Sequence, residues 1–523
     1  MVEGHVPARE WRFESSHPHF STFDHLPLLR IEVVMKSCAS ILFAFCLISG
    51  TWVSNPQLIQ AADPSQVDHQ QVSQSLRKAV DFFQQHVSIQ GGYLWRYSSD
   101  LKKREGEGKA SETTAWVQPP GTPSVGEALL RVYLRTGDRF YRDAARQTAL
   151  ALVQGQLRSG GWDYRIEFAS EQRARYAYRT DEAQSRSRNT TTLDDNTTQS
   201  ALRFLMHIDR TLEFKDPQIH EAVLYCLKSL LAVQYPNGAW PQRYSEYPDP
   251  AKFPVRKANY PPTWSRTYPA KDYRTYYTFN DNTMSDVIDV MFEATAIYND
   301  ERYRQAAEKC GDFILLAQMP APQPAWAQQY NAACQPAWAR KFEPASITGG
   351  ESQGIMQALL KLYRKTGKAK YLNAVEPALE YLEDSRLPDG RLARFYELKT
   401  NKPLYFTKKY ELTYQADDLP THYGFIVGSQ LGSIRKDFER LREQGPDQLG
   451  KPKAPDYRAE RMTSSLQQQA AEIVAAQDKR GAWIDQQPLR YQGADDSTDK
   501  IINCSTFISH IDLLSRYLAA SRK

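Results

Sequence analysis

Two short stretches of this chain place several oxygen-bearing side chains directly before an apolar helix pattern. They are "TTLDDNTTQSALRFL" (191–205) and "YYTFNDNTMSDVIDVM" (276–291). A helix start needs only one such residue as a cap. The surplus suggests a cation or a polar ligand, and two such clusters brought together could coordinate Ca²⁺, which takes about six to eight oxygen ligands. The oxygen donors are Asp194, Asp195, Asn196, Asn280, Asp281 and Asn282.

Helix capping remains the alternative for each of these residues taken singly, since Asp and Asn are leading cap residues. The spacing is also not that of an EF-hand loop. For Asp194 and Asp281, which we expect at equivalent positions of the two stretches, we favour a metal site over two caps. Thr192 or Asp195 would then cap the first helix.

A third stretch, "PAWARKFEPASITGGESQGI" (336–355), adds a base and two acids. The ordinary fate of Arg340 would be a surface ion pair, with Glu343 or Glu351 as its partner. Glu351 also suits the first turn of a helix, where a negative charge is favourable. Alternatively, the two glutamates are carboxylates of a hydrolase.

An internal repeat supplies the elements that must position these stretches. In each unit a helix ends at a turn with Gly and often Trp, a polar loop follows, and a second helix with apolar residues at i, i+3, i+4 and i+7 begins. The turns are "IQGGYLW" (89–95), "LRSGGW" (157–162), "QYPNGAW" (234–240), "QMPAPQPAW" (318–326), "RLPDGRLARFY" (386–396) and "QDKRGAW" (477–483).

Helical hairpins of this kind cannot bury their apolar faces alone and must stack. We therefore predict an all-α fold, an (α/α) toroid of repeated helical hairpins with long loops at one mouth. The three oxygen-rich stretches fall at matching places in successive repeats, so they would face the same mouth.

The chain divides into five predicted parts. Residues 1–34 are interpreted as an upstream extension that is not part of the fold. Residues 35–62 have the basic start, short apolar run and small residues of a signal peptide. The toroid is predicted over 63–440, a Pro- and Lys-rich linker over 441–455, and a last helical hairpin over 456–523 that packs on the toroid.

Composition narrows the partners. The net charge is +5 and the chain has no Lys/Arg blocks, which argues against nucleic acid. Beyond the predicted signal peptide, no segment is apolar and long enough for a membrane helix, so we expect no membrane partner. The sequence leaves the oligomeric state open. The 12% aromatic residues suit sugar-stacking surfaces and ordinary cores alike.

Several motifs, found in the same order along residues 152–425, resemble those of the pectate lyases of polysaccharide lyase family 10, the pectic acid lyases. That family shows "T-[IF]-D-N-x-A-T", "QYPNGGWPQ", "TFND-D-AM" and "PA-x-AR-x-YE-x-PS-x-S-G-x-ES-x-GI". This chain has "TLDDNTT", "QYPNGAWPQRY", "TFNDNTM" and "PAWARKFEPASITGGESQGI". The resemblance implies a helical toroid and a secreted, Ca²⁺-dependent lyase that cleaves polygalacturonate by β-elimination.

The resemblance also implies roles for residues. Asp194 and Asp281 match the aspartates that hold Ca²⁺, and Arg340 matches the arginine that removes the proton. Because arginine has a reference pKa above about 12, such a base predicts activity that favours alkaline pH. The residues expected to bind substrate are Asp195, Trp240, Arg243, Asn280, Lys341, Glu343 and Arg394.

Two departures from the family pattern bear on the substrate. Asp195 stands where the family has Asn, which adds a carboxylate to the site. Leu419 and Pro420 stand where the family has paired arginines that hold substrate carboxylates. Two alternatives therefore stay open: a non-catalytic or altered-specificity uronate-binding member of the same fold, and a toroidal glycoside hydrolase that uses two carboxylates such as Asp194 and Glu351.

Overall fold

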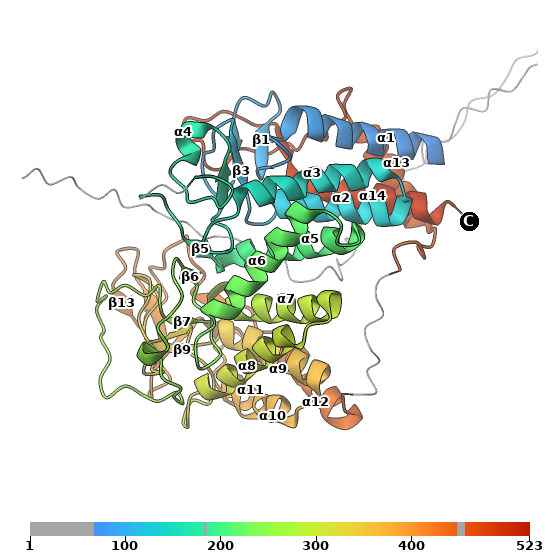
Figure 1. Cartoon of the computed structure of the whole chain (residues 1–523). Helices are drawn as coiled ribbons and strands as arrows, with labels where there is room; N and C mark the ends of the chain where they lie inside the picture. The colour runs from blue at the N-terminus through green and yellow to red at the C-terminus, as the bar shows by residue number, and fades with distance from the viewer. Residues whose placement is uncertain (1–66, 183–185, 447–455, 523) are drawn as a thin grey trace, which may run out of the picture. The chain divides into compact units, whose positions relative to one another are not determined.

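A computed structural model describes residues 67–182, 186–446 and 456–522 (Figure 1). Contacts divide the chain into residues 1–64 and Ser65–Lys523, and every described residue belongs to the second unit. The predicted extension and signal peptide lie outside the described residues. The predicted linker begins too early, because helix α12 (Leu431–Gln444) continues into it, and residues 447–455 are not described.

Five helices that follow one another in space form the inner layer. Successive members contact each other in the order α14, α2, α5, α7 and α9. Each packs against an outer helix, and α1 contacts both helices of the last hairpin. The inner helices are α14 (Cys504–Ala520), α2 (Thr122–Thr136), α5 (Thr197–Thr211), α7 (Thr283–Tyr298) and α9 (Glu351–Thr366). The outer helices are α1 (His69–Phe82), α3 (Arg139–Gly155), α6 (Pro217–Val233), α8 (Glu301–Ala317), α10 (Ala369–Asn373), α11 (Val375–Asp384) and α13 (Ser464–Ala476).

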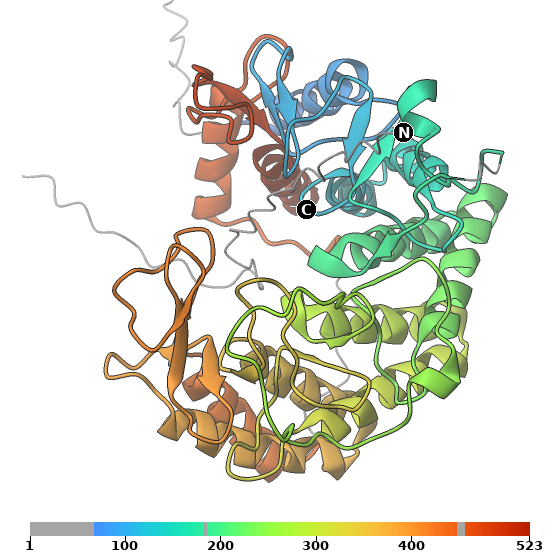
Figure 2. The ribbon, with the colours of Figure 1, turned by 90° about the vertical axis from the view of Figure 1, so that its left-hand side faces the viewer.

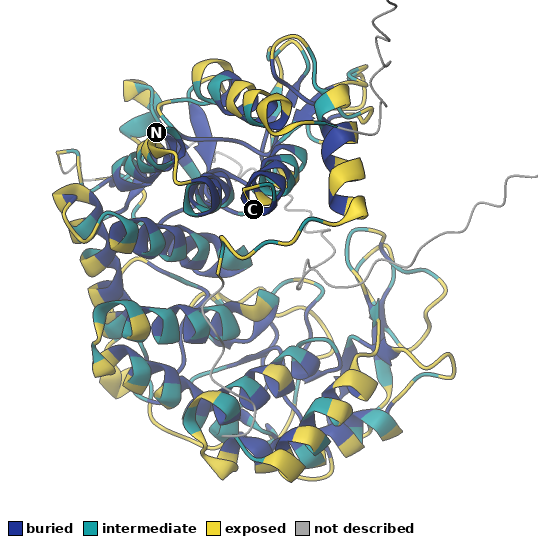
Figure 3. Cartoon of the chain, turned by 90° about the vertical axis from the view of Figure 1, so that its right-hand side faces the viewer, coloured by how far each residue is buried: buried dark blue, intermediate teal, exposed yellow. Residues whose placement is uncertain are grey.

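Short turns connect the inner helices α2, α5, α7 and α9 to the outer helices that follow them. The outer helix α3, which follows α2, is capped by Asp138, whose carboxylate accepts a hydrogen bond from the Phe140 amide. Gly137 ends α2 in the left-handed region at φ +73°, where glycine carries no steric penalty. Asp216 and Asp300 cap α6 and α8 in the same way. Figure 3 shows the buried faces between the helices and the exposed residues on their outward faces.

The repeated turns join each outer helix to the next through glutamine. In each turn the side-chain amide nitrogen donates to a carbonyl within its own turn and to a carbonyl of the next outer element. The glutamines are Gln156, Gln234, Gln318 and Gln477. Each glutamine therefore ties the turn that carries it to the neighbouring outer element. The turn tryptophans Trp162, Trp240, Trp326 and Trp483 donate back to the preceding helix.

A strand of two or three residues precedes each inner helix and pairs antiparallel with a strand from a neighbouring loop. Figures 1 and 2 show these strands and loops together at one end of the helices. The pairs that carry the site are β5 (Thr191–Thr192) with β6 (Arg243–Tyr244), β7 (Tyr277–Thr278) with β8 (Gln329–Tyr330), and β9 (Ser346–Thr348) with β11 (Phe395–Glu397). Five further strands lie at the same end: β3 (Thr114–Trp116) pairs with β4 (Arg165–Glu167), and β1 (Arg96–Ser98) lies between β15 (Ile501–Asn503) and β2 (Arg104–Glu105).

The remaining strands extend one of these pairings and form one separate pair. Strand β11 continues into β12 (Pro403–Phe406) and β13 (Leu412–Thr413), while β10 (Leu392–Ala393) pairs with β14 (Ile426–Val427). The prediction of an all-α fold of repeated helical hairpins, the (α/α) toroid class with its loops at one mouth, is confirmed. Within the described residues, no helix combines the length and the apolar character needed to cross a membrane.

Candidate active site

Two matching turns form the centre of the site. Asp194–Asn196 and Asn280–Asn282 are each a single 3₁₀ turn, and in both the second and third residues adopt the left-handed conformation, at φ +51° and +56° in the first and +48° and +57° in the second. Asn and Asp tolerate this region better than other residues with a Cβ. Their backbone shapes therefore make Asp195, not Asp194, the equivalent of Asp281. Our expectation that Asp194 and Asp281 occupy equivalent positions of the two stretches is wrong.

The helix-cap alternative is also wrong for these residues. Neither α5 nor α7 receives a side-chain hydrogen bond at its N-cap. Thr192 and Thr278 instead stabilise the two turns. The hydroxyl of each accepts a hydrogen bond from the backbone N–H two residues later (3.2 and 3.1 Å). The acidic side chains are left to point away from their own helices.

Asp194, Asp195 and Asp281 form one cluster. Each offers a carboxylate oxygen, and the three oxygens lie within 4.8 Å of one another. Oδ1 of Asp194 is buried and has no hydrogen-bond partner among the described residues. Three convergent hard oxygen donors, one of them unsatisfied, are what a hard divalent cation such as Ca²⁺ requires. The donor set therefore fits a metal ion.

The charges of the cluster show why it needs one. Burial raises the pKa of Asp195 well above its usual range, and the carboxylates of Asp194 and Asp281 raise it further. Burial and the Asp194 carboxylate raise the pKa of Asp281 to about 8. For Asp194, burial is outweighed by the guanidinium groups of Arg243 and Arg340, which hold its pKa below the usual value. Without a cation, the three groups cannot all be ionised at neutral pH.

Arg243 and Tyr164 hold the Asp194 side chain in place. The Tyr164 hydroxyl donates to Oδ2 of Asp194 (2.9 Å) and lies 3.3 Å from Oδ2 of Asp195. Arg243, expected to bind substrate, uses Nη2 on the same Asp194 oxygen (3.1 Å) and on the Tyr164 hydroxyl. Its exposed edge still faces the mouth, because its side chain is 28% exposed.

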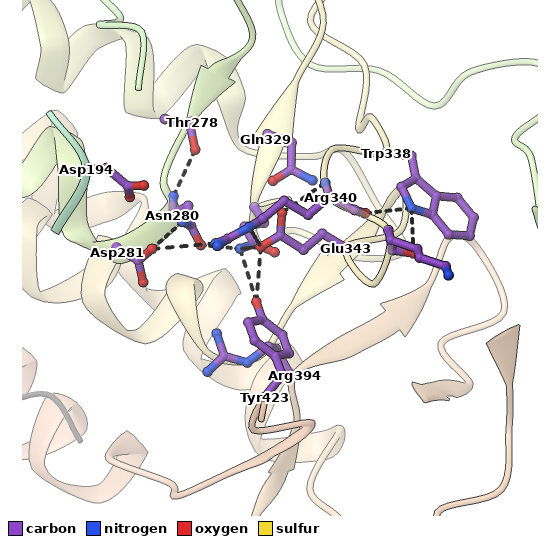
Figure 4. Close-up of polar contacts among 12 residues, drawn as sticks. Asp194, Thr278, Asn280, Asp281, Gln329, Trp338, Arg340, Glu343, Arg394 and Tyr423 are labelled. Atoms are coloured by element: carbon purple, nitrogen blue, oxygen red, sulfur yellow. Dashed lines mark hydrogen bonds and ion pairs between the residues drawn. The ribbon is translucent and has the colours of Figure 1, made fainter. Parts of the chain in front are cut away.

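Arg340 lies against this cluster, as Figure 4 shows. Its Nη2 is 3.6 Å from Oδ2 of Asp281, and its Nε donates to Oε1 of Glu343 (2.8 Å). The backbone N–H of Arg340 donates to the other Glu343 oxygen (3.1 Å). Burial alone would lower the pKa of Arg340, but the Glu343 and Asp281 carboxylates raise it well above its usual value. These carboxylates thus favour the protonated guanidinium.

A hydrogen-bond chain connects Asn280 to Glu343. Gln328 donates to Asn280 Oδ1 and to Glu343 Oε1 (3.0 Å). The Tyr423 hydroxyl donates to the same Glu343 oxygen (3.3 Å), and the Asn280 amide donates to Asp281. Glu343 is 2% exposed and is fully engaged by these groups. Of the predicted substrate residues, Asn280 and Glu343 thus position Asp281 and Arg340 (Figure 4).

Arg394 lies beside this chain of bonds. Its Nη1 pairs with Glu351 (2.7 Å), its Nε donates to the Gly424 carbonyl (2.6 Å), and its guanidinium lies 4.7 Å from the centre of the Tyr423 ring. Lys341 instead points toward the Tyr410 ring, 4.7 Å from its centre. Leu419 packs against the hydrophobic core and brings no charge to the site.

Trp240 is not a substrate-binding residue. It is 0% exposed, and its indole N–H donates to the Leu230 carbonyl. Equivalent bonds from Trp162 and Trp326 show that this position anchors the repeated turn. The motif "QYPNGAWPQ" therefore contributes a core residue where we expected a sugar platform.

Sequence reasoning missed several residues that contact the cluster. Tyr164, Gln242 and Gln328 each lie two residues after the tryptophan of a repeated turn. Tyr164 and Gln328 hydrogen-bond to an oxygen-rich turn, Tyr164 to Asp194 and Gln328 to Asn280. The Gln242 carbonyl accepts the N–H of Leu193, directly before the first of these turns (2.8 Å). The repeat itself could have identified that position. Tyr423 and Glu107 come from segments with no such pattern.

The comparison with protein families identifies the resemblance. The family model described as pectic acid lyase matches residues 156–391, which confirms the predicted resemblance. By that match the chain is a polysaccharide lyase. Asp194, Asp195, Asp281 and Arg340 all lie within the matched residues, whereas Glu107 and Tyr423 lie outside them. Among curated proteins, none matches this chain.

Similar solved structures include a family 10 polysaccharide lyase from Cellvibrio cellulosa, at 21% sequence identity and a TM-score of 0.41, which covers 62% of this chain and 97% of that one. A mutant family 10 polysaccharide lyase from the same organism, in complex with trigalacturonic acid, matches at 20% identity and a TM-score of 0.41. The match covers 62% of this chain and 98% of that one. A cellobiose 2-epimerase from Spirochaeta thermophila matches at 11% identity, a TM-score of 0.41, and 87% and 96% coverage.

Proposed function

We propose that this chain, a polysaccharide lyase by its family match, is a Ca²⁺-dependent pectate lyase that cleaves polygalacturonate by β-elimination. The observation that carries the proposal is the position of Arg340, which lies 3.6 Å from a carboxylate of the three-aspartate cluster. A base beside a metal site is the arrangement needed to remove a proton next to a bound uronate carboxylate.

Asp194, Asp195 and Asp281 would hold the cation. When bound, Ca²⁺ neutralises charge on the substrate carboxylate, which makes the neighbouring C5 proton more acidic and stabilises the enolate-like transition state. Tyr164 and Arg243 keep Asp194 oriented for this task through the bonds to its Oδ2 atom. Asn280 orients Asp281 in the same way.

Arg340 is the proposed base. Its Nε is used by Glu343 and its Nη2 faces Asp281, so Nη1 is the nitrogen left for the substrate. In the reaction Arg340 takes the C5 proton, the C5–H electrons form the C4=C5 double bond, and the C4–O bond breaks. The departing oxygen then takes a proton from solvent. Because the guanidinium must first be neutral, turnover should increase toward alkaline pH.

Arg394 is the proposed contact for a substrate carboxylate. Its guanidinium is fixed by Glu351 and by the Gly424 carbonyl, and its second terminal nitrogen, Nη2, makes no hydrogen bond among the described residues. An arginine held in this way can present the free edge of its fork to a carboxylate at little entropic cost. It would supply part of what the missing pair at Leu419 and Pro420 supplies in the family.

We further propose that the enzyme acts outside the cell. The predicted signal peptide at 35–62 fits a polymeric substrate that is itself extracellular. Expression of the full chain followed by N-terminal sequencing of the exported protein tests this part, and a mature start between residues 60 and 65 is the expected result.

One assay tests the reaction. The purified chain is incubated with polygalacturonate in Ca²⁺ or in chelator, and the ultraviolet absorbance of the unsaturated product is followed. We expect product only with Ca²⁺, and we expect Arg340→Ala to reduce kcat by at least about a thousandfold while circular dichroism stays unchanged. Reducing ends without the unsaturated product would identify a hydrolase and refute the proposal.

A specific observation favours one alternative function. The carboxylates that raise the pKa of Arg340 oppose its use as a base, and this favours a non-catalytic uronate-binding protein. Such a protein would bind polygalacturonate with Ca²⁺ and give neither product. The same assay, combined with a binding measurement, separates the two functions.

A further inference from the structure

A tight turn outside the family-matched residues lies against the site. The turn spans residues 105–109 and follows β2, and an isolated bridge pairs Glu105 with Lys109. Glu105 is fully buried and pairs with Arg96 (2.7 Å). It also accepts the backbone N–H groups of Arg490 and Tyr491 (2.9 and 2.8 Å). The base of the turn is thus fixed between the N-terminal strands and the last hairpin.

The tip of the turn is fixed by packing on an indole ring. A Cβ atom on Gly106 would lie 2.1 Å from the Trp116 ring, so only glycine fits this close approach. The Gly106 N–H donates to the Gly108 carbonyl (3.0 Å). Between these two glycines stands Glu107, which the turn therefore presents in one place.

Gln118 orients the Glu107 carboxylate. The Trp116 indole N–H donates to Oε1 of Gln118 (3.0 Å), which leaves the Gln118 amide nitrogen to favour the charged form of the Glu107 carboxyl. Gln118 is itself 4% exposed, and its backbone carbonyl accepts the Trp95 indole N–H (2.9 Å). The acid therefore has a built support, unlike a flexible surface glutamate.

The turn that carries Glu107 lies beside the proposed active site. It packs on Trp116, and the N–H of the next residue, Val117, donates to the Tyr164 carbonyl (2.7 Å), while the Tyr164 hydroxyl holds Asp194 (2.9 Å). From this position the charge of Glu107 is repelled by the Asp194 carboxylate and attracted by the Arg340 and Arg243 guanidinium groups. The charge of Glu107 in turn adds to the effects of burial and of the neighbouring aspartates that raise the pKa of Asp195. The buried Oδ1 atom of Asp194 lies in this same region without a partner among the described residues. A further carboxylate thus stands near the place where the reacting sugar must bind.

We propose that Glu107 is a specificity residue that binds hydroxyl groups of the sugar next to the reacting uronate and selects a neighbour without a free carboxylate. The preferred substrate would then be a partly methyl-esterified galacturonan, or a polymer in which uronates alternate with neutral sugars. This inference rests on the proposed function for the position of the reacting uronate.

The chemistry of a carboxylate accounts for this selection. An ionised carboxylate only accepts hydrogen bonds, which sugar hydroxyls donate. A second uronate carboxylate offers no donor and carries the same charge, so it is repelled. In the family, paired arginines add positive charge to the substrate site. Here Leu419 and Pro420 add none, so nothing at that position offsets Glu107.

The test compares two trisaccharides by isothermal titration calorimetry. One is trigalacturonate, and the other is the same trisaccharide with methyl esters on both outer carboxylates. Both are titrated with Ca²⁺ into Arg340→Ala and into the Arg340→Ala/Glu107→Gln double variant, so that neither ligand is cleaved. A pH of 9 keeps Glu107 ionised, because burial raises its pKa only to about 7.

The ratio of the two dissociation constants is the readout. We expect Glu107→Gln to shift it toward trigalacturonate by about tenfold, the effect of unit charges about 6 Å apart in an effective dielectric constant of about 40. The exposed Glu112→Gln on the same segment removes the same charge and should leave the ratio unchanged. An unchanged ratio in the Glu107 variant would overturn the proposal.

The outcome for the proposed function is separate. If the wild-type chain forms no unsaturated product from polygalacturonate or from its partly methyl-esterified form, pectate lysis is refuted. The ratio of the two dissociation constants still decides the role of Glu107. A Glu107→Asp variant keeps the charge and should restore part of the preference for the esterified ligand. A purely structural role would instead weaken both ligands equally.

Discussion

Replacing Asp195 by Asn introduces the residue that the resembled family has at this position. The substitution tests whether Asp195 is a metal ligand or a structural residue. Asparagine keeps a side-chain oxygen for the Tyr164 hydroxyl and tolerates the left-handed backbone at φ +51°. The substitution therefore removes one negative charge and little else. Since the N-cap of α5 receives no side-chain hydrogen bond, no cap is lost.

The expected size follows from the geometry of the cluster. Two ionised carboxylates 4.8 Å apart repel each other by about 3.5 kcal/mol at an effective dielectric constant of about 20. Asp281, with a pKa raised to about 8 by burial and by Asp194, is half protonated at pH 8, which reduces this cost. We expect the calcium-free Asp195→Asn protein to be more stable than the wild type by about 2 kcal/mol. Its affinity for Ca²⁺ should be lower by about tenfold or more, because one charged ligand is lost.

Urea unfolding in chelator at pH 8 measures the first quantity, and Ca²⁺ titration calorimetry measures the second. The exposed Glu246→Gln, on the loop after β6, removes the same charge away from the cluster and should change neither. The opposite directions of the two effects are the diagnostic. A calcium-free variant that is less stable, with an unchanged calcium affinity, would make Asp195 a structural residue and refute the reasoning.

Three further predictions follow from the same contacts. In chelator, the wild type should lose stability from about pH 4 to about pH 8 and change little above: Asp281 binds its proton more tightly in the folded protein, with a pKa of about 8, than in the unfolded chain, so raising the pH favours unfolding. Thermal melts at several pH values check this, and a rise over that range would contradict it. Arg394→Lys should raise KM about tenfold and spare kcat, because lysine cannot reproduce the bidentate fork, whereas the exposed Arg391→Lys should change neither in steady-state kinetics. Gln234→Leu should cost about 2–4 kcal/mol in urea unfolding, because the carbonyls of Gly238 and Ala306 lose their donor; a loss below about 0.5 kcal/mol would show that the glutamine brace is dispensable.

The repeat made the fold predictable from sequence. Apolar periodicity located the inner and outer helices, and the Gly-Trp turns located their connections, because both depend on local patterns that survive in a single chain. The strands were not predicted. Strands such as β5 and β7 span two residues each, too few for an alternating pattern to show, and they exist only because neighbouring loops lie side by side.

The site was predictable where a residue type carried the chemistry. Asp194, Asp281 and Arg340 do lie together, and a surplus of oxygen donors had indicated them. Trp240 shows the limit of this approach, because a tryptophan beside polar residues looks the same in sequence whether it stacks on sugar or donates a hydrogen bond in the core. Its recurrence in five of the six turns was the better guide, since a repeated residue serves the repeated structure.

Glu107 shows a second limit. Nothing in "REGEGK" distinguishes it from an exposed loop acid, and it lies 87 positions from Asp194 along the sequence. Its place depends on a buried ion pair at Glu105, on a glycine against Trp116, and on backbone groups of the last hairpin. Interactions that connect the two ends of a chain leave no local pattern, so only the structure reveals them.

The aspartate cluster and Arg340 are coupled electrostatically, because the charge of each changes the pKa values of the other. In calcium-free form the aspartate cluster raises the pKa of Arg340, which is unfavourable for a base, while Arg340 lowers the pKa of Asp194, which is favourable for a metal ligand. A divalent cation reverses the first effect, because it offsets the carboxylates that stabilise the guanidinium. Calcium dependence and alkaline activity should therefore change together. Asp195→Asn, which leaves one negative charge fewer beside Arg340, should shift the pH–rate profile toward lower pH at saturating Ca²⁺. A profile that does not move would mean that Arg340 does not respond to the cluster, and another group would have to be the base.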